Sequence, residues 1–65
     1  MKQDEKRGLT KRNLINSYVV SLTAQNDKDI LTAVKLINSF EKRLKKYEIK
    51  SCKYQAQMIL NSLGV

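Results

Sequence analysis

Lysine and arginine are the residues of this chain whose number and spacing suggest a chemical role. The 65 residues include 13 lysines and arginines, six aspartates and glutamates and no histidine, which gives a formal net charge of +7. Clustered cations bind phosphate oxygens, and a basic stripe is typical of proteins that bind the nucleic-acid backbone. The sequence therefore predicts phosphate contacts from an early and a later cluster, which are Lys2, Lys6, Arg7, Lys11 and Arg12, and Lys42, Arg43, Lys45, Lys46 and Lys50.

The residue types argue against catalytic and metal chemistry. Cys52 is the one cysteine, so it cannot form a disulfide within the chain, and there is no histidine to join it in a nucleophilic pair or a zinc site. We expect no enzyme activity, no cofactor and no metal. Cys52 is expected to be a buried structural thiol. The alternative is a reactive thiolate whose pKa is lowered by Lys50 and Lys53.

The elements that must position the cations are predicted to be helices. The chain has no proline, and its two glycines, Gly8 and Gly64, lie near its ends, so the residues between them hold no helix breaker. The stretch 26–50 carries apolar residues at alternating steps of three and four, as in a coiled coil. We predict that this seam is an oligomer or partner interface, and it consists of Ile30, Ala33, Ile37, Phe40, Leu44 and Tyr47.

We expect an all-α fold with helices at about 10–25, 27–48 and 51–63, the first two forming an antiparallel hairpin. Residues 1–9 are expected to be a flexible basic arm, and residues 10–65 a single small domain. A single helix through the second and third segments is an open alternative, because no glycine or proline marks the end of the second helix.

Capping residues and apolar faces suggest these bounds. The candidate N-caps, whose side chains can accept a hydrogen bond from a first-turn amide, are Thr10, Asn26 or Asp27, and Ser51. The predicted buried arc of the first helix holds Leu14, Ile15, Tyr18, Val19 and Leu22. The predicted buried face of the third helix holds Cys52, Ala56, Ile59, Leu60 and Leu63. Gly64 fits the position that follows a helix.

A hairpin that turns at Asn26 brings the two cation clusters together. Residue 10 then lies opposite about residue 42, and each is ~24 Å from the turn along its helix. Asp27 and Asp29 lie at the other end. We therefore predict one basic pole, and Tyr47 and Tyr54 beside it could stack on bases if the nucleic acid is single-stranded.

Apolar residues outside the seam predict further contacts. They lie off the faces expected to be buried, and they are Val20, Leu31, Leu36, Tyr54 and Met58. Such a surplus favours subunit contacts or docking of another protein, and small domains often gain stability by oligomerising, so we expect a dimer or higher. The charged start and the absence of a long apolar run predict a cytoplasmic protein without membrane contact.

The combined expectation is a small non-enzymatic accessory or regulatory protein that binds nucleic acid, with DNA favoured, comparable in size and charge to such proteins of phages and plasmids. No helix-turn-helix, zinc-finger or basic-zipper pattern predicts sequence specificity. Two other interpretations stay open. The later cluster could be only the solvated end of a helix, where cations are favoured, or the chain could be an inhibitor or adaptor that inserts an amphipathic helix into a partner's groove.

Overall fold

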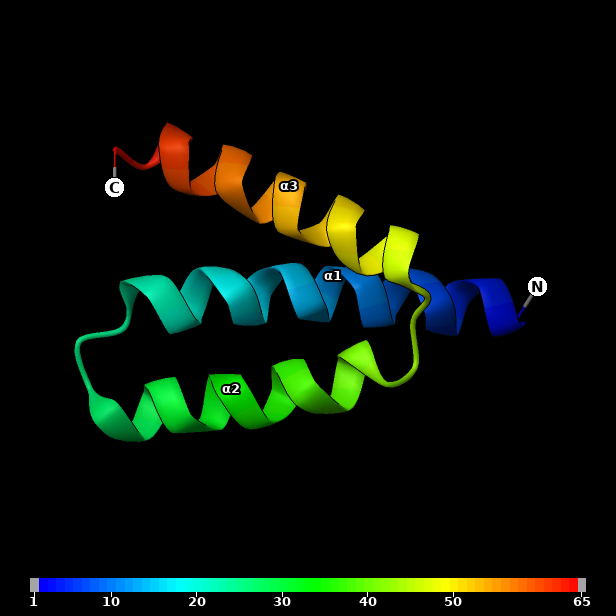
Figure 1. Cartoon of the computed structure of the whole chain (residues 1–65), viewed down its shortest axis with the longest axis horizontal. Helices are drawn as coiled ribbons and strands as arrows, with labels where there is room; N and C mark the ends of the chain where they lie inside the picture. The colour runs from blue at the N-terminus through cyan, green and yellow to red at the C-terminus, as the bar shows by residue number, and fades with distance from the viewer. Residues whose placement is uncertain (1, 65) are drawn as a thin grey trace.

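Three α-helices make up the part of the chain that the structure describes. The computed structural model describes the backbone of residues 2–64 and the side chains of residues 8–64. The helices are α1 (Lys2–Thr23), α2 (Asp27–Glu41) and α3 (Lys46–Ser62), and no strand occurs among these residues (Figure 1). The predicted all-α class is therefore confirmed.

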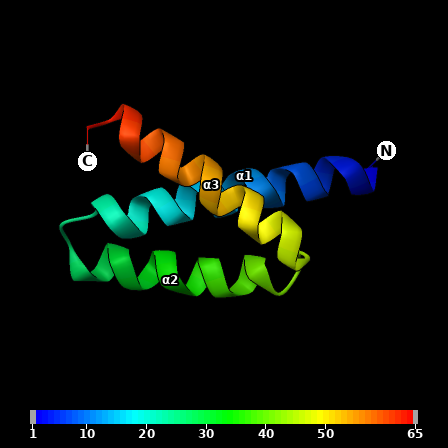
Figure 2. The same cartoon turned by 45° about the horizontal axis from the view of Figure 1, so that its top comes forward.

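The helix α1 is central, and α2 and α3 pack on different sides of it. After a short connection α2 runs back along α1, and α3 then crosses α1 at an angle (Figures 1 and 2). Direct contacts between α2 and α3 are few. As far as the chain is described, no helix combines the length and apolarity needed to cross a lipid bilayer.

The core lies where the three helices come together around Leu14. This side chain is fully buried and packs with Leu44 and Cys52. Half-buried residues that surround the three are Ile15, Tyr18, Ile37, Phe40 and Ile49. Burying a side chain of leucine size stabilises the fold by about 1.5–3 kcal/mol, so this cluster determines where α2 and α3 meet α1. The predicted burial of Cys52 is confirmed.

The helix α1 begins earlier than the sequence pattern predicts. It starts at Lys2, so both the predicted start at Thr10 and the role of Thr10 as an N-cap are wrong. Five of the first seven residues, Lys2, Gln3, Glu5, Lys6 and Arg7, are of types that favour helix when no tertiary contact decides otherwise. Whether they act as a flexible basic arm stays a prediction, because the side chains of residues 1–7 lie outside the described part of the chain.

The buried stripe of α1 is narrower than predicted. Leu22 was expected to face the core but is 64% exposed. Ser17 is buried instead, and its hydroxyl donates a hydrogen bond to the carbonyl of Asn13 at 2.8 Å. A small side chain that satisfies its own hydrogen bond on the same helix can be covered closely without a polar penalty.

Two helix ends follow the predicted capping signals. Asn26 has an extended backbone, and its side-chain oxygen accepts a hydrogen bond from the Lys28 amide at 2.8 Å. Asp27 and Asp29 lie in the first turn of α2, where carboxylates complement the helix dipole. Gly64 follows α3 with φ of 78°, a left-handed conformation that favours glycine. The starting point of α2 and the role of Gly64 are confirmed.

The end of α2 is the largest correction to the predicted fold. The helix stops at Glu41 and α3 starts at Lys46, so neither a second helix reaching residue 48 nor one continuous helix occurs. Ser51, a predicted N-cap, lies inside α3. The apolar seam continues through this region, and therefore gives no sign of the break.

Burial explains why the chain turns between these two helices. The turn buries Leu44 in the core and directs α3 back along α1. Glu48, in the first turn of α3, accepts a hydrogen bond from the Lys45 amide at 3.0 Å, which is one half of a capping box. The reciprocal half is missing, because a lysine ammonium cannot accept a hydrogen bond.

Candidate nucleic-acid interface

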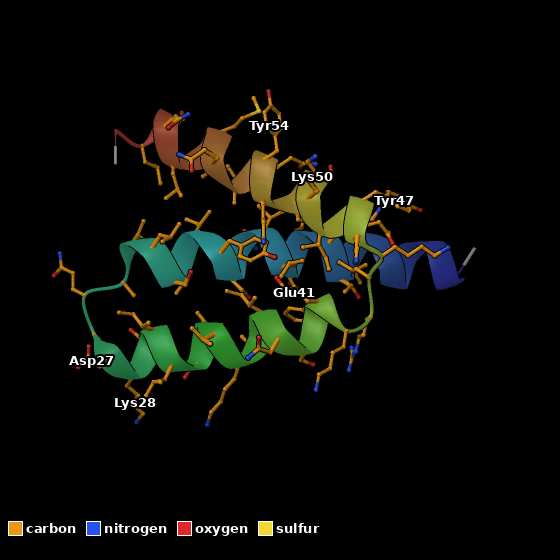
Figure 3. All side chains as sticks on the ribbon, in the orientation of Figure 1. Asp27, Lys28, Glu41, Tyr47, Lys50 and Tyr54 are labelled. Carbon is orange, nitrogen blue, oxygen red and sulfur yellow. The ribbon has the colours of Figure 1, made fainter. Side chains whose placement is uncertain are left out.

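Exposed cations surround the connection between α2 and α3 and continue along α3. We call this set the cationic surface, and it consists of Lys42, Arg43, Lys45, Lys46, Lys50 and Lys53. All six side chains are exposed, and within the described residues none of them forms an ion pair. Because part of this surface lies at the start of α3, the positive end of the helix dipole adds to its positive potential. The other end of the molecule carries Asp27 and Lys28 (Figure 3).

The two carboxylates that the sequence places among these cations point inward. Glu48 is only 2% exposed, and its carboxylate lies 3.2 Å from the ammonium of Lys11. Glu41 is half-buried and accepts a hydrogen bond from the Tyr18 hydroxyl. Each carboxylate thus has a partner on α1, and neither of the two is fully exposed beside the cationic surface.

Burial and the two carboxylates also shift the titration of nearby groups. The pKa of Tyr18 is raised well above its usual value, chiefly because burial disfavours the phenolate, with the hydrogen bond to Glu41 and its charge adding to the shift. Burial likewise raises the pKa of the Cys52 thiol, against the opposing charge of Lys11 and with a smaller addition from Glu48. A buried thiol held protonated is a poor nucleophile.

The structure brings only part of the early cluster to the later one. Lys11 lies beside the first turn of α3, but its ammonium is engaged by Glu48. Arg12 is exposed and, like Lys11, lines a hollow of about 390 Å³ between α1 and α3. The side chains of Lys2, Lys6 and Arg7 lie outside the described residues. Phosphate contacts from the early cluster therefore stay a prediction.

The apolar seam predicted to be an intermolecular interface mostly faces the inside of the chain. Ala33 and Leu44 are buried, while Ile37 and Phe40 pack against the core. Ile30 is half-buried, and Tyr47 alone of the six is largely exposed. The reason is that α1 covers the seam, so its pattern reports packing within one chain. Whether the exposed part of the seam, such as Tyr47, also contacts a second chain stays a prediction.

Exposed apolar residues do occur beside a groove between α1 and α2. The groove has a volume of about 490 Å³. Its apolar lining is Val20, Ala33, Leu36 and Phe40, and its polar lining is Asn13, Asn16, Ser17, Asp29 and Thr32. Large apolar side chains that the sequence placed off the buried faces are exposed, as predicted: Val20, Leu31, Leu36, Tyr54 and Met58.

Sequence reasoning missed the inward orientation of Glu41 and Glu48. In the sequence both lie among lysines and arginines, where an exposed carboxylate would reduce the net charge of its neighbours. A signal for Glu48 existed, since it lies three positions after Lys45, the spacing at which a glutamate caps the start of a helix. No local pattern marks the contact of Glu41 with Tyr18, because the two lie 23 positions apart. Among the described residues no cluster of potential metal ligands occurs.

Comparison of the chain with protein-family models, with curated proteins and with solved structures finds no match in any of the three.

Proposed function

We propose that this chain is a small, non-enzymatic accessory or regulatory protein that binds nucleic acid through the phosphate backbone. The observation that carries the proposal is the cationic surface with its two neighbouring carboxylates, Glu41 and Glu48, turned toward α1. A purely solvated helix end would be expected to pair some of its lysines with these carboxylates at the surface. Here six cations remain free to meet phosphates.

The physical basis is the release of counterions. Each phosphate neutralised by a lysine or arginine frees a condensed cation from the nucleic acid, which makes affinity rise as salt falls. The acidic first turn of α2 lies at the other end of the molecule, so the charge asymmetry would orient the protein on the approach to a polyanion.

The finer parts of the proposal follow from the same surface. We propose DNA as the nucleic acid, an antiparallel α1–α2 hairpin as the rigid support, and a cytoplasmic location. We also propose a dimer or higher oligomer, which would double the number of phosphate contacts. Its interface would use exposed residues such as Leu31 and Leu36, since Ala33 and Leu44 are buried within the chain.

The test is a fluorescence-anisotropy titration with random-sequence DNA at several salt concentrations, with oligomer mass measured in parallel. We expect micromolar binding at low salt, with log affinity falling linearly against log salt at about −0.9 per duplex phosphate contacted. Reversal of two charges in Lys42→Glu/Arg43→Glu should weaken binding at least tenfold and reduce the slope by about 2.

The matched control is Lys28→Glu/Lys35→Glu, which changes the net charge equally on the exposed part of α2. If both double variants bind equally weakly, the effect comes from net charge alone and the cationic surface is not the binding site. If the unaltered protein binds neither duplex nor single strand at low salt, the proposed function is refuted.

A second candidate function is supported by the groove between α1 and α2. Its apolar lining includes Val20 and Leu36, which are exposed, and apolar grooves of this kind accept helices of other proteins. In that case the chain is an interaction module, an inhibitor or adaptor. Binding to its partner would depend little on salt, and Leu36→Lys would abolish it while Lys42→Glu/Arg43→Glu would not.

A further inference from the structure

The outward face of α3 carries two tyrosines that the fold does not use. Tyr47 is 68% exposed and Tyr54 is 69% exposed. Their side chains and that of Lys50 extend from the side of α3 that faces away from α1 (Figure 3). Within the described residues neither tyrosine hydroxyl makes a hydrogen bond. The packing of α3 uses its opposite face, on which Cys52, Ala56 and Leu60 are buried.

The two tyrosines leave α3 from nearly the same side of the helix. They are seven positions apart, so they are separated by about two helical turns, or ~10.5 Å along the axis, and by only about 20° around it. Two aromatic rings of this kind form a row along the helix. Because water solvates both rings in the free protein, stacking a flat apolar partner on them removes apolar surface from water.

Lysines lie along one edge of this aromatic row. Lys46, Lys50 and Lys53 follow at steps of four and three, and with Ile49 they line a hollow of about 250 Å³. The three lysines span ~10.5 Å along the helix axis, as the tyrosines do, and they lie about 40–120° from the tyrosines around that axis, all on one side. Each nucleotide of one strand in stacked duplex DNA rises about 3.4 Å along the helix axis, so this length of α3 corresponds to the rise of roughly three stacked nucleotides.

This pairing of aromatic and cationic rows fits an unpaired strand better than a duplex. In a duplex the faces of the bases are stacked on one another, so a tyrosine on a convex helix surface cannot reach them without distorting the DNA. In a single strand each base face can stack on an aromatic ring while the phosphates follow a row of cations. A duplex would engage the lysines and leave Tyr47 and Tyr54 without a role.

We infer that the outward face of α3 is a binding track for single-stranded nucleic acid, with bases stacked on Tyr47 and Tyr54 and phosphates held by Lys46, Lys50 and Lys53. The inference rests on the proposed function and names its ligand. Stacking on an aromatic ring and contact with a phosphate do not depend on which base is present. Binding to the track is therefore tolerant of sequence.

The experiment compares a labelled oligothymidine with a random duplex of the same length, titrated with the full-length chain at one low salt concentration. Three proteins are used: the unaltered chain, Tyr47→Ala/Tyr54→Ala and Tyr47→Phe/Tyr54→Phe. Both positions are largely exposed, so neither substitution is expected to unfold the chain, and circular dichroism verifies this. The phenylalanine variant is the matched control because it keeps the rings that stack.

We expect the unaltered chain to bind the single strand at least about tenfold more tightly than the duplex. The alanine variant should lose about 30-fold or more in single-strand affinity, at about fivefold or more for each ring. Its duplex affinity should change less than twofold, and the phenylalanine variant should keep single-strand affinity within about threefold.

The possible failures are distinguishable. If the alanine variant binds both DNAs as tightly as the unaltered chain, or if the duplex binds more tightly than the single strand, the inferred track is refuted while phosphate-backbone binding stands. If neither DNA binds, the proposed function fails and the track with it. Binding to vesicles of anionic phospholipid in the absence of DNA binding would assign the same face to a membrane surface and overturn the inference.

Discussion

Glu48 is the residue whose replacement tests most directly how the connection between α2 and α3 is held. We predict that Glu48→Ala lowers the free energy of unfolding by about 2–3 kcal/mol. The carboxylate is 2% exposed, accepts a hydrogen bond from the Lys45 amide at 3.0 Å and lies 3.2 Å from the Lys11 ammonium. The substitution removes these interactions together.

The magnitude follows from the separate contributions. Loss of a side chain that caps a helix start costs about 1 kcal/mol. The ion pair adds about 0.5–1 kcal/mol, a low value because the Lys11 side chain is 44% exposed and water screens it. Removing the buried methylene that carries the carboxylate adds about 0.8 kcal/mol. The total is large against the ~3–5 kcal/mol that a core of this size supplies.

Thermal unfolding followed by far-ultraviolet circular dichroism measures the effect. A destabilisation of this size lowers the Tm by about 10–20 °C in a domain this small. Glu48→Gln should recover about half, because its amide oxygen can still accept from the Lys45 amide. The control is Asp29→Asn, which removes one negative charge at an exposed position and should cost at most about 1 kcal/mol. If Glu48→Ala and Asp29→Asn unfold at the same temperature, Glu48 does not hold the start of α3.

Three further predictions concern the core and its titrating groups. Leu14→Ala should lower the free energy of unfolding by about 2–5 kcal/mol, because it leaves a cavity at the centre of the core. The control Leu22→Ala, at a position that is 64% exposed, should change the free energy of unfolding by less than about 0.5 kcal/mol. Urea unfolding measures both values, and equal effects of the two substitutions would contradict the core described above. The pKa values of Tyr18 and Cys52 are raised from 10.0 and 9.0, so the folded chain holds both protons more tightly than the unfolded chain does. Their contribution to stability is complete below pH 9 and is lost as the pH rises above the pKa values of the unfolded chain. The urea concentration at the midpoint of unfolding should therefore fall as the pH rises through this alkaline range, and it should fall less for Tyr18→Phe than for the unaltered chain. The Cys52 thiol, which is buried and has a raised pKa, should react with an aromatic disulfide reagent slowly in the native protein and rapidly in urea; rapid reaction without urea would show that the thiol is accessible.

Local signals in the sequence were sufficient for the helix class and for some helix ends. Asn26 and Gly64 act at the positions predicted, because a cap depends on hydrogen bonds and backbone angles within a few residues. The burial of Cys52 also followed from its position on an apolar face. Each of these features is determined by residues close together in the chain.

The end of α2 could not be predicted in this way, because it depends on residues far apart. Leu44 continues the heptad pattern and looks like part of a longer helix, but it is buried in a turn against Leu14. Glu48 is held by Lys11, which is 37 positions away. A single sequence gives no measure of such contacts, so it does not show that α1 covers most of the apolar seam.

The candidate site was predicted by charge but not by geometry. The later cluster is exposed as its composition indicated, and Lys53 joins it on α3. The sequence could not show that Glu41 and Glu48 turn toward α1, nor that the ammonium of Lys11 is engaged by a carboxylate. These facts depend on which side of each helix meets α1, and that depends on the unpredicted turn.

The central position of α1 has a consequence for the order in which the chain opens. Because α2 and α3 make few contacts with each other, α3 depends on α1 for its packing, through pairs as distant as the Lys11 carbonyl and the Cys52 thiol, 41 positions apart. Closing a longer loop costs more entropy than joining neighbouring helices. Native-state hydrogen exchange of the α3 amides should therefore proceed through an opening that leaves α1 and α2 folded. A helix of 17 residues released from the fold has only marginal stability in water. The row of Tyr47, Lys50 and Tyr54 therefore exists only while α3 is packed on α1. A ligand bound along this row would slow the hydrogen exchange of the α3 amides.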